Sequence, residues 1–220
     1  MRKPLSLLFA FLLLAFSLMA TAFGVADIYR NEAASLVEQW SWPEDEGPPA
    51  WAWEQVERYL WLASRLAPFD AQIQGELGQL YERRVVAAKA PESAPDLERA
   101  LDYYRYSLAL RPAWPDAWVD VALLKITQER LDAEFALALQ RALTLGPWQT
   151  IAQASIAGGG LSVWGQLPAT LQTQIEHSVA RGLANRSRLM PLVARRFGLF
   201  ESGETDPAHA PASSRQPPEG

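Results

Sequence analysis

The spacing of prolines behind amphipathic runs constrains the fold of this chain more than any other feature. Pro68, Pro112 and Pro147 each close such a run. Each has a small residue five positions upstream, namely Ala63, Ser107 and Ala142. Proline stops a helix, and a small residue lets a neighbouring helix approach closely. The repeated arrangement predicts stacked helical hairpins, an architecture that favours a binding scaffold over a catalytic pocket.

The middle of the chain, residues 53–147, resembles the tetratricopeptide-repeat family. The best-matched stretch places small, aromatic and proline residues at the family's spacing in Ala100, Tyr104, Ser107, Pro112, Trp118, Val121 and Ala122. The preceding helix supplies Leu77, Gly78 and Tyr81, but Gln74 replaces the family's aromatic residue. The resemblance implies antiparallel helix pairs with a concave binding face. An unrelated α-helical bundle is the alternative.

In that family, the first helix of each pair lines the concave face. The resemblance carries this partner-binding role to Gln72, Gln79, Glu82, Arg83, Asp116 and Thr127. Val119 and Leu123 lie among the second set and make it less polar, which suggests that the terminal helices cover that surface.

A finer resemblance is to VpsP-type polysaccharide biosynthesis proteins from bacterial exopolysaccharide gene clusters. It rests on the hydrophobic N-terminal segment, the stretch from Leu108 to Trp118 and the stretch from Ala142 to Trp148. It implies a role in polysaccharide biosynthesis beside envelope or polysaccharide-export proteins. It brings no catalytic residue and no cofactor.

The N-terminal segment is long and apolar enough to cross a membrane. Pro4 to Ala26 contains no charged residue, and about 20 apolar residues suffice for a spanning helix. Arg2 and Lys3 precede it, which predicts a cytoplasmic N-terminus and a periplasmic main domain at the bacterial inner membrane. The alternative is a signal peptide cleaved after Ala22. We expect residues 1–26 to be a retained anchor.

The rest of the chain divides into four predicted parts. They are an amphipathic helix with a Trp-, Pro- and acid-rich connector (27–52), the hairpins (53–147), C-terminal capping helices (148–200) and a disordered tail (201–220). Hairpin helices are predicted near 50–66, 69–86, 96–111, 115–128 and 131–145. A helix near 186–197 is expected to kink at Pro191. The predicted fold class is therefore all-α.

Composition excludes several classes of function. The net charge of −5 argues against nucleic-acid binding, and the absence of cysteine excludes thiol chemistry and cysteine-ligated zinc. His177 and His209 lie too far apart in the sequence to suggest a metal site. Gly158-Gly159-Gly160 lacks the Lys-Ser/Thr of a phosphate loop, so a helix interruption, a kink or a close helix contact is expected there. We expect no cofactor and no enzymatic activity.

Four tryptophans, Trp40, Trp42, Trp51 and Trp53, cluster around an acidic turn. They suit packing at the edge of the first hairpin, contact with a membrane or partner, or stacking on a sugar beside Glu44, Asp45 and Glu46. Adjacent acids on a proline-rich turn are poorly placed for glycoside cleavage.

A second candidate surface is basic and lies near the C-terminus. It consists of Arg181, Arg186, Arg188, Arg195 and Arg196, opposed in residues 147–200 by Glu176 alone. Such a face could meet anionic lipid, acidic polysaccharide or an acidic partner, or it could pair with the acidic first half of a chain.

The leading hypothesis is a non-enzymatic, membrane-anchored periplasmic scaffold that supports biosynthesis or export of a cell-surface polysaccharide. The alternative is a carbohydrate-binding module that uses the Trp40–Trp53 segment. A third is a glycan hydrolase that uses Glu44 or Glu82.

Overall fold

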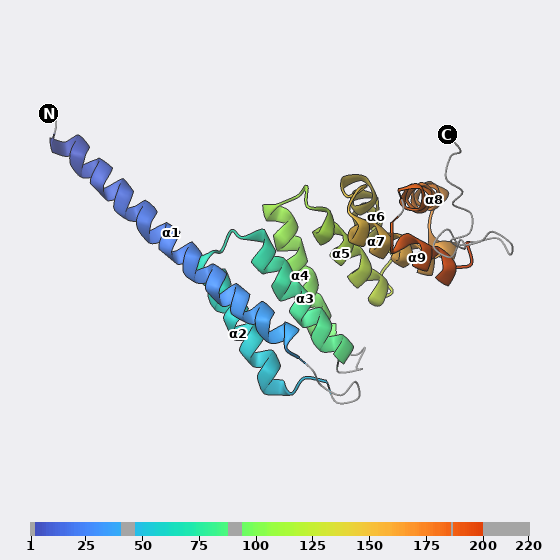
Figure 1. Cartoon of the computed structure of the whole chain (residues 1–220), viewed down its shortest axis with the longest axis horizontal. Helices are drawn as coiled ribbons and strands as arrows, with labels where there is room; N and C mark the ends of the chain where they lie inside the picture. The colour runs from blue at the N-terminus through green and yellow to red at the C-terminus, as the bar shows by residue number, and fades with distance from the viewer. Residues whose placement is uncertain (1–2, 41–46, 88–93, 186, 200–220) are drawn as a thin grey trace, which may run out of the picture. The chain divides into compact units, whose positions relative to one another are not determined.

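The computed structural model describes residues 3–40, 47–87, 94–185 and 187–199. In these ranges every regular element is a helix, which confirms the predicted all-α fold (Figure 1). The chain forms two compact units, unit 1 (Met1–Leu124) and unit 2 (Lys125–Gly220). Several residues with predicted roles lie outside the described residues, namely Trp42, Glu44, Asp45, Glu46, Arg186, His209 and the tail.

The helices lie close to their predicted positions. Those of unit 1 are α1 (Lys3–Glu38), α2 (Ala50–Leu66), α3 (Ala71–Ala87), α4 (Ala94–Leu110) and α5 (Pro115–Thr127), the last of which continues into unit 2. Those of unit 2 are α6 (Ala133–Leu145), α7 (Thr150–Ser162), the short 3-10 helix η1 (Trp164–Gln166), α8 (Ala169–Ala184) and α9 (Met190–Arg196).

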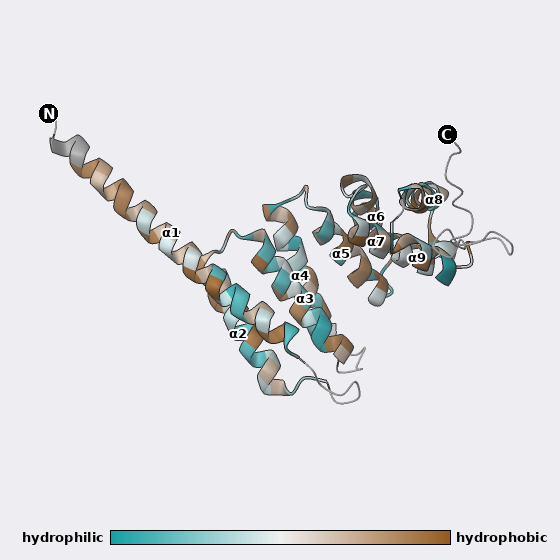
Figure 2. Ribbon diagram, viewed as in Figure 1, coloured by the Kyte–Doolittle hydropathy of each residue, from teal (hydrophilic) through white to brown (hydrophobic). Residues whose placement is uncertain are grey.

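Helix α1 combines two segments that the sequence suggested were separate. It is apolar and exposed in its first half (Figure 2), and the part from Leu7 onward is long and apolar enough to cross a membrane. A signal sequence passes the same test of length and composition. Its second half buries Ala26 and Ala33 in the core of unit 1. The predicted boundary between residues 26 and 27 therefore falls inside one uninterrupted helix.

One hydrophobic cluster of unit 1 lies where α1, α2 and α3 meet. It contains Ala26, Ala33, Trp53, Val56, Leu60, Ala63, Ala67, Ile73, Leu77 and Leu80. The α3–α4 hairpin is closely packed because Gly78 lies under the ring of Tyr104, where an added Cβ would stand 2.5 Å from Tyr104 Cε1. The glycine thus permits the close helix approach that the sequence pattern predicted.

The three proline-containing turns share one set of hydrogen bonds. In each, the residue before proline donates its backbone N–H to the small residue four positions earlier, and its own carbonyl accepts from the residue three positions later. The first bonds are Ala67 to Ala63 (2.9 Å), Arg111 to Ser107 (2.9 Å) and Gly146 to Ala142 (3.3 Å). Ala63, Ser107 and Ala142 are all buried. The spacing therefore reflects a repeated way of ending one helix and starting the next.

Unit 2 corrects two predictions. The predicted interruption at Gly158-Gly159-Gly160 is wrong, because α7 runs through these residues. The alternative of a close helix contact is confirmed, because a side chain at Gly160 would strike Ile175 of α8. The predicted kink at Pro191 is also wrong. Helix α9 begins at Met190, so Pro191 stands in its first turn, where the missing N–H has no helical partner to lose.

Candidate functional site

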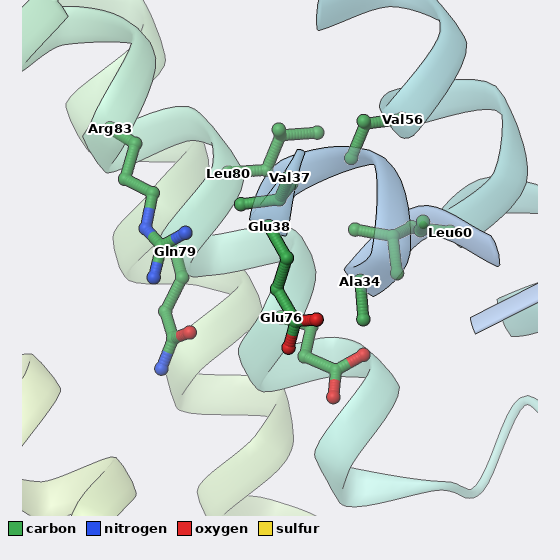
Figure 3. A pocket seen from close by; sticks show the side chains of 10 residues that line it. Ala34, Val37, Glu38, Val56, Leu60, Glu76, Gln79, Leu80 and Arg83 are labelled. Carbon is green, nitrogen blue, oxygen red and sulfur yellow. The ribbon is translucent and has the colours of Figure 1, made fainter. Parts of the chain in front are cut away.

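A pocket of about 240 Å³, here called the α3 pocket, lies between α1, α2 and α3 in unit 1 (Figure 3). Its apolar wall is formed by Ala33, Ala34, Val37, Val56, Leu60 and Leu80. Its polar residues are Glu38, Glu76, Gln79 and Arg83, three of which project from α3. Gln79 and Arg83 belong to the predicted partner-binding set, so the structure brings these two together at a concave site.

Glu76 supplies a half-buried carboxylate to this pocket. Gln72 donates a hydrogen bond from Nε2 to Glu76 Oε1 (3.0 Å), and Arg30 Nε lies 3.9 Å from the same oxygen. Burial raises the pKa of Glu76 above its ordinary value, although Gln72 and Arg30 oppose that shift. Sequence reasoning missed Glu76, whose only signal was its place one helical turn after Gln72 and one before Gln79 and Leu80.

Asp120 of α5 extends the polar side of the site beyond the pocket. Gln79 Nε2 lies 3.4 Å from Asp120 Oδ2 and donates a hydrogen bond to it. Burial raises the pKa of Asp120 to about 7, against the hydrogen bond from Gln79, and the charge of Glu82 adds to the rise. Asp120 was also missed, although it stands one helical turn after the predicted Asp116 and so shares its face.

The carboxylate of Glu82 accepts a hydrogen bond within unit 1 and does not face an open groove. Tyr104 donates its hydroxyl to Glu82 Oε2 at 2.7 Å. Burial raises the pKa of Glu82, while Tyr104 and the charge of Arg83 pull it down. Arg83 itself is exposed at the rim of the pocket. A partner would therefore meet Arg83 before it met Glu82.

The other predicted groove residues do not line the pocket, although Gln72 and Glu82 contact residues near it. Gln72 lines a different pocket beside Phe69, and Asp116 accepts a hydrogen bond from Trp114 Nε1 (2.9 Å). Thr127 belongs to unit 2 and is exposed there. Of the predicted partner-binding residues, only Gln79 and Arg83 thus line the same pocket.

The tryptophan cluster is a packing feature where the structure describes it. Trp40 meets Trp53 edge to face, with ring centroids 4.6 Å apart. Trp53 is buried and donates from Nε1 to the carbonyl of Pro48 (3.0 Å), which leaves it no open face for a sugar ring. Trp51 is 59% exposed. This geometry favours the edge-packing interpretation over sugar stacking.

The basic residues of unit 2 differ in exposure. Arg188, Arg195 and Arg196 are exposed, whereas Arg181 is half-buried in α8. Arg196 lies 5.9 Å from the ring of Phe197. The surface available to an anionic partner is therefore centred on α9 and the residues just before it.

Side chains that can ligate a metal ion are dispersed in the part of the chain that the structure describes. No group of three or more His, Asp or Glu side chains there is arranged to hold a metal ion. His177 is exposed on α8. What the α3 pocket offers is an apolar wall beside hydrogen-bonding groups of both charges.

No protein-family model matches the chain, and no curated protein matches its sequence.

Proposed function

We propose that this protein is a non-enzymatic, single-pass membrane scaffold whose helical domain docks a partner protein in the α3 pocket. The pocket carries the proposal, because it joins an apolar wall to Glu76, Gln79 and Arg83 within the unit that contains the apolar helix. At about 240 Å³ it is smaller than the roughly 300–1,000 Å³ of small-molecule sites. That size suits one or two apolar side chains of a partner better than a substrate.

The finer part of the proposal concerns place and pathway. Arg2 and Lys3 before the apolar run support a cytoplasmic N-terminus, with the helical domain in the bacterial periplasm. The resemblance to VpsP-type proteins supports a role in exopolysaccharide biosynthesis or export, with envelope proteins as partners. Anchoring would favour docking by raising the local concentration of the domain near membrane-bound partners.

Photo-crosslinking in the native cell tests the docking. A photoreactive amino acid replaces Arg83 at the pocket rim, and a matched control replaces Asp102, which is exposed on α4. We expect position 83, but not position 102, to yield a discrete adduct with an envelope protein. A second substitution, Ala34→Trp, places an indole at the exposed edge of the pocket and should abolish that adduct.

Two results would contradict the docking. One is an identical set of adducts from positions 83 and 102. The other is an adduct at position 83 that persists when Ala34→Trp fills the pocket. An adduct made of glycan alone would instead favour a carbohydrate-binding protein.

A further inference from the structure

The turn between α2 and α3 presents one apolar side chain to the outside. Phe69 is 77% exposed, the highest value of any large apolar side chain in the described residues. Exposed single apolar residues are common on proteins, so exposure alone assigns no role. The setting of Phe69 is what distinguishes it.

Hydrogen bonds on both sides hold the turn around Phe69 in place. Asp70 accepts at Oδ1 from the backbone N–H groups of Gln72 (2.8 Å) and Ile73 (3.3 Å), which caps the start of α3. Tyr106 of α4 donates its hydroxyl to the carbonyl of Pro68 (3.3 Å). Phe69 is therefore displayed from a fixed turn.

Phe69 lies beside α1 at the end of its apolar segment. It lines a pocket of about 480 Å³ together with Phe23, Ala26 and Asp27 of α1 and with Arg111 after α4. A hydrocarbon core takes about 20 helical residues, which, counted from Pro4, end at Phe23. Phe69 therefore lies at the depth in the membrane at which α1 would pass from the hydrocarbon core into the headgroup region.

The aromatic and basic residues at this level are of the types found at a membrane interface, and they lie beside the acidic Asp27 and Asp70. Phe23 is 46% exposed and continues the exposed apolar side chains of α1 toward Phe69. Arg111 lies 5.2 Å from the ring of Trp114, which gives the same end of the unit an aromatic and a basic side chain. Aromatic rings and long basic side chains are favoured where hydrocarbon gives way to headgroups.

We propose that Phe69 inserts into the interfacial region of the same bilayer that α1 crosses, as a second membrane contact of unit 1. This inference rests on the proposal that α1 is a retained span. A bilayer is the occupant because the surface is continuous with α1, whose exposed apolar side chains lipid would cover. Two contacts, one along α1 and one at the α2–α3 turn, would hold unit 1 in one orientation on the membrane.

Single-cysteine labelling of the full chain tests this contact, and the sequence contains no cysteine to interfere. Phe69→Cys carries an environment-sensitive nitrobenzoxadiazole probe in vesicles of phosphatidylcholine and phosphatidylglycerol. Val86→Cys is the matched control, because Val86 is 67% exposed at the other end of α3. We expect a blue-shifted emission at position 69, quenched by lipids with nitroxides near the headgroup, and neither effect at position 86.

A third labelled position distinguishes failure of the Phe69 contact from failure of the proposed membrane span. Leu14→Cys reports on α1, where Leu14 is 60% exposed, and it is read with lipids that carry nitroxides deep in the acyl chains, because Leu14 lies near the middle of the span. If position 14 is quenched by lipid while position 69 behaves like position 86, the second contact is refuted and the span stands. A blue-shifted but unquenched probe at position 69 also refutes it, because a protein or a second copy then covers Phe69. No quenching at position 14 refutes the anchor, and the second contact with it.

Discussion

In unit 1 hydroxyl groups hold half-buried carboxylates, whereas in unit 2 two carboxylates hold a buried ammonium group. Tyr104 donates to Glu82 at 2.7 Å. Tyr81 donates to Glu57 at 2.6 Å, where Arg84 adds an ion pair at 2.8 Å and the pKa of Glu57 is lowered despite its burial. In unit 2 the Nζ of Lys125, whose side chain is 1% exposed, lies 2.6 Å from Asp132 and 2.8 Å from Glu134. Tyr81 and Lys125 occupy matching positions in the sequence pattern, because they follow the small residues Gly78 and Ala122 by three positions.

The difference shows that matching positions of two hairpins can hold either a neutral hydroxyl, as in Tyr81, or a charged ammonium group, as in Lys125. A hydroxyl is a neutral partner, so it only partly offsets the cost of burying a carboxylate, and the pKa of Glu82 stays raised by burial. An ammonium brings its own charge, and the hydrogen bond from Lys125 lowers the pKa of Asp132. The stability of unit 1 should therefore depend on the protonation of Glu82 and of Asp120, whose pKa burial raises to about 7, whereas unit 2 should depend on keeping its ion pairs.

The largest effect is expected when Lys125 loses both partners. Asp132→Asn with Glu134→Gln leaves a buried ammonium without a countercharge, which should destabilise unit 2 by about 3–5 kcal/mol. Asparagine still caps a helix, so the start of α6 is preserved. Hydrogen exchange of α5 and α6 peptides in the full chain measures the loss. Adding Lys125→Met should restore most of the protection, and a triple variant no more stable than the double would contradict the assignment.

A smaller effect is expected from crowding the Tyr104 ring in unit 1. Gly78→Ala places a Cβ 2.5 Å from Tyr104 Cε1 and should cost about 1–3 kcal/mol, because Tyr104 must move away from Glu82. Gly75→Ala is the matched control on α3, since its Cβ would stand 3.7 Å from Ser107 Oγ. That control should be neutral or gain up to about 1 kcal/mol of helix propensity. Equal loss of α3–α4 exchange protection in both variants would rule out the steric explanation.

The smallest effect is the pH response of unit 1. The pKa of Asp120, raised to about 7, exceeds its ordinary value of 3.8, so the folded state holds the proton more tightly. This contribution is fully present below about pH 4 and is lost as the pH rises through about 7. Unit 1 should lose on the order of 1 kcal/mol between about pH 5 and pH 8, once solvent screening is allowed for.

Asp120→Asn should flatten that response, while unit 2 should show no comparable loss over the same range. Exchange protection in each unit, corrected for the intrinsic exchange rate at each pH, provides the measurement. Stabilisation of unit 1 as the pH rises from 5 to 8 would show that the sign is wrong.

Local sequence patterns were sufficient for most of the helix boundaries. The expected range 50–66 coincides with α2, and 131–145 differs from α6 only at its start. Apolar periodicity and the prolines explain this success, because both act within one or two helical turns. The small residues before the prolines were expected to be buried for the same reason, and they are.

Features that depend on distant partners were harder to predict. A glycine run normally argues for a break, yet α7 continues through Gly160 because Ile175 needs the space. The change from apolar to amphipathic residues near Ala26 suggested a domain boundary. No proline lies there, and α1 continues through Gly24, so the helix does not end at that point. In the candidate site, the role of Asp120 depends on Gln79 from another helix. A single sequence does not reveal such a pairing.

The continuity of α1 has a mechanical consequence. A helix without a break transmits rotation, so unit 1 would follow the angle of α1 rather than swivel on a flexible tether. Under the proposed topology, a bilayer thinner than the apolar segment makes α1 tilt. The same rotation would turn the proposed docking pocket toward or away from neighbouring proteins. The thickness of the host bilayer would then help to select which partners can be reached.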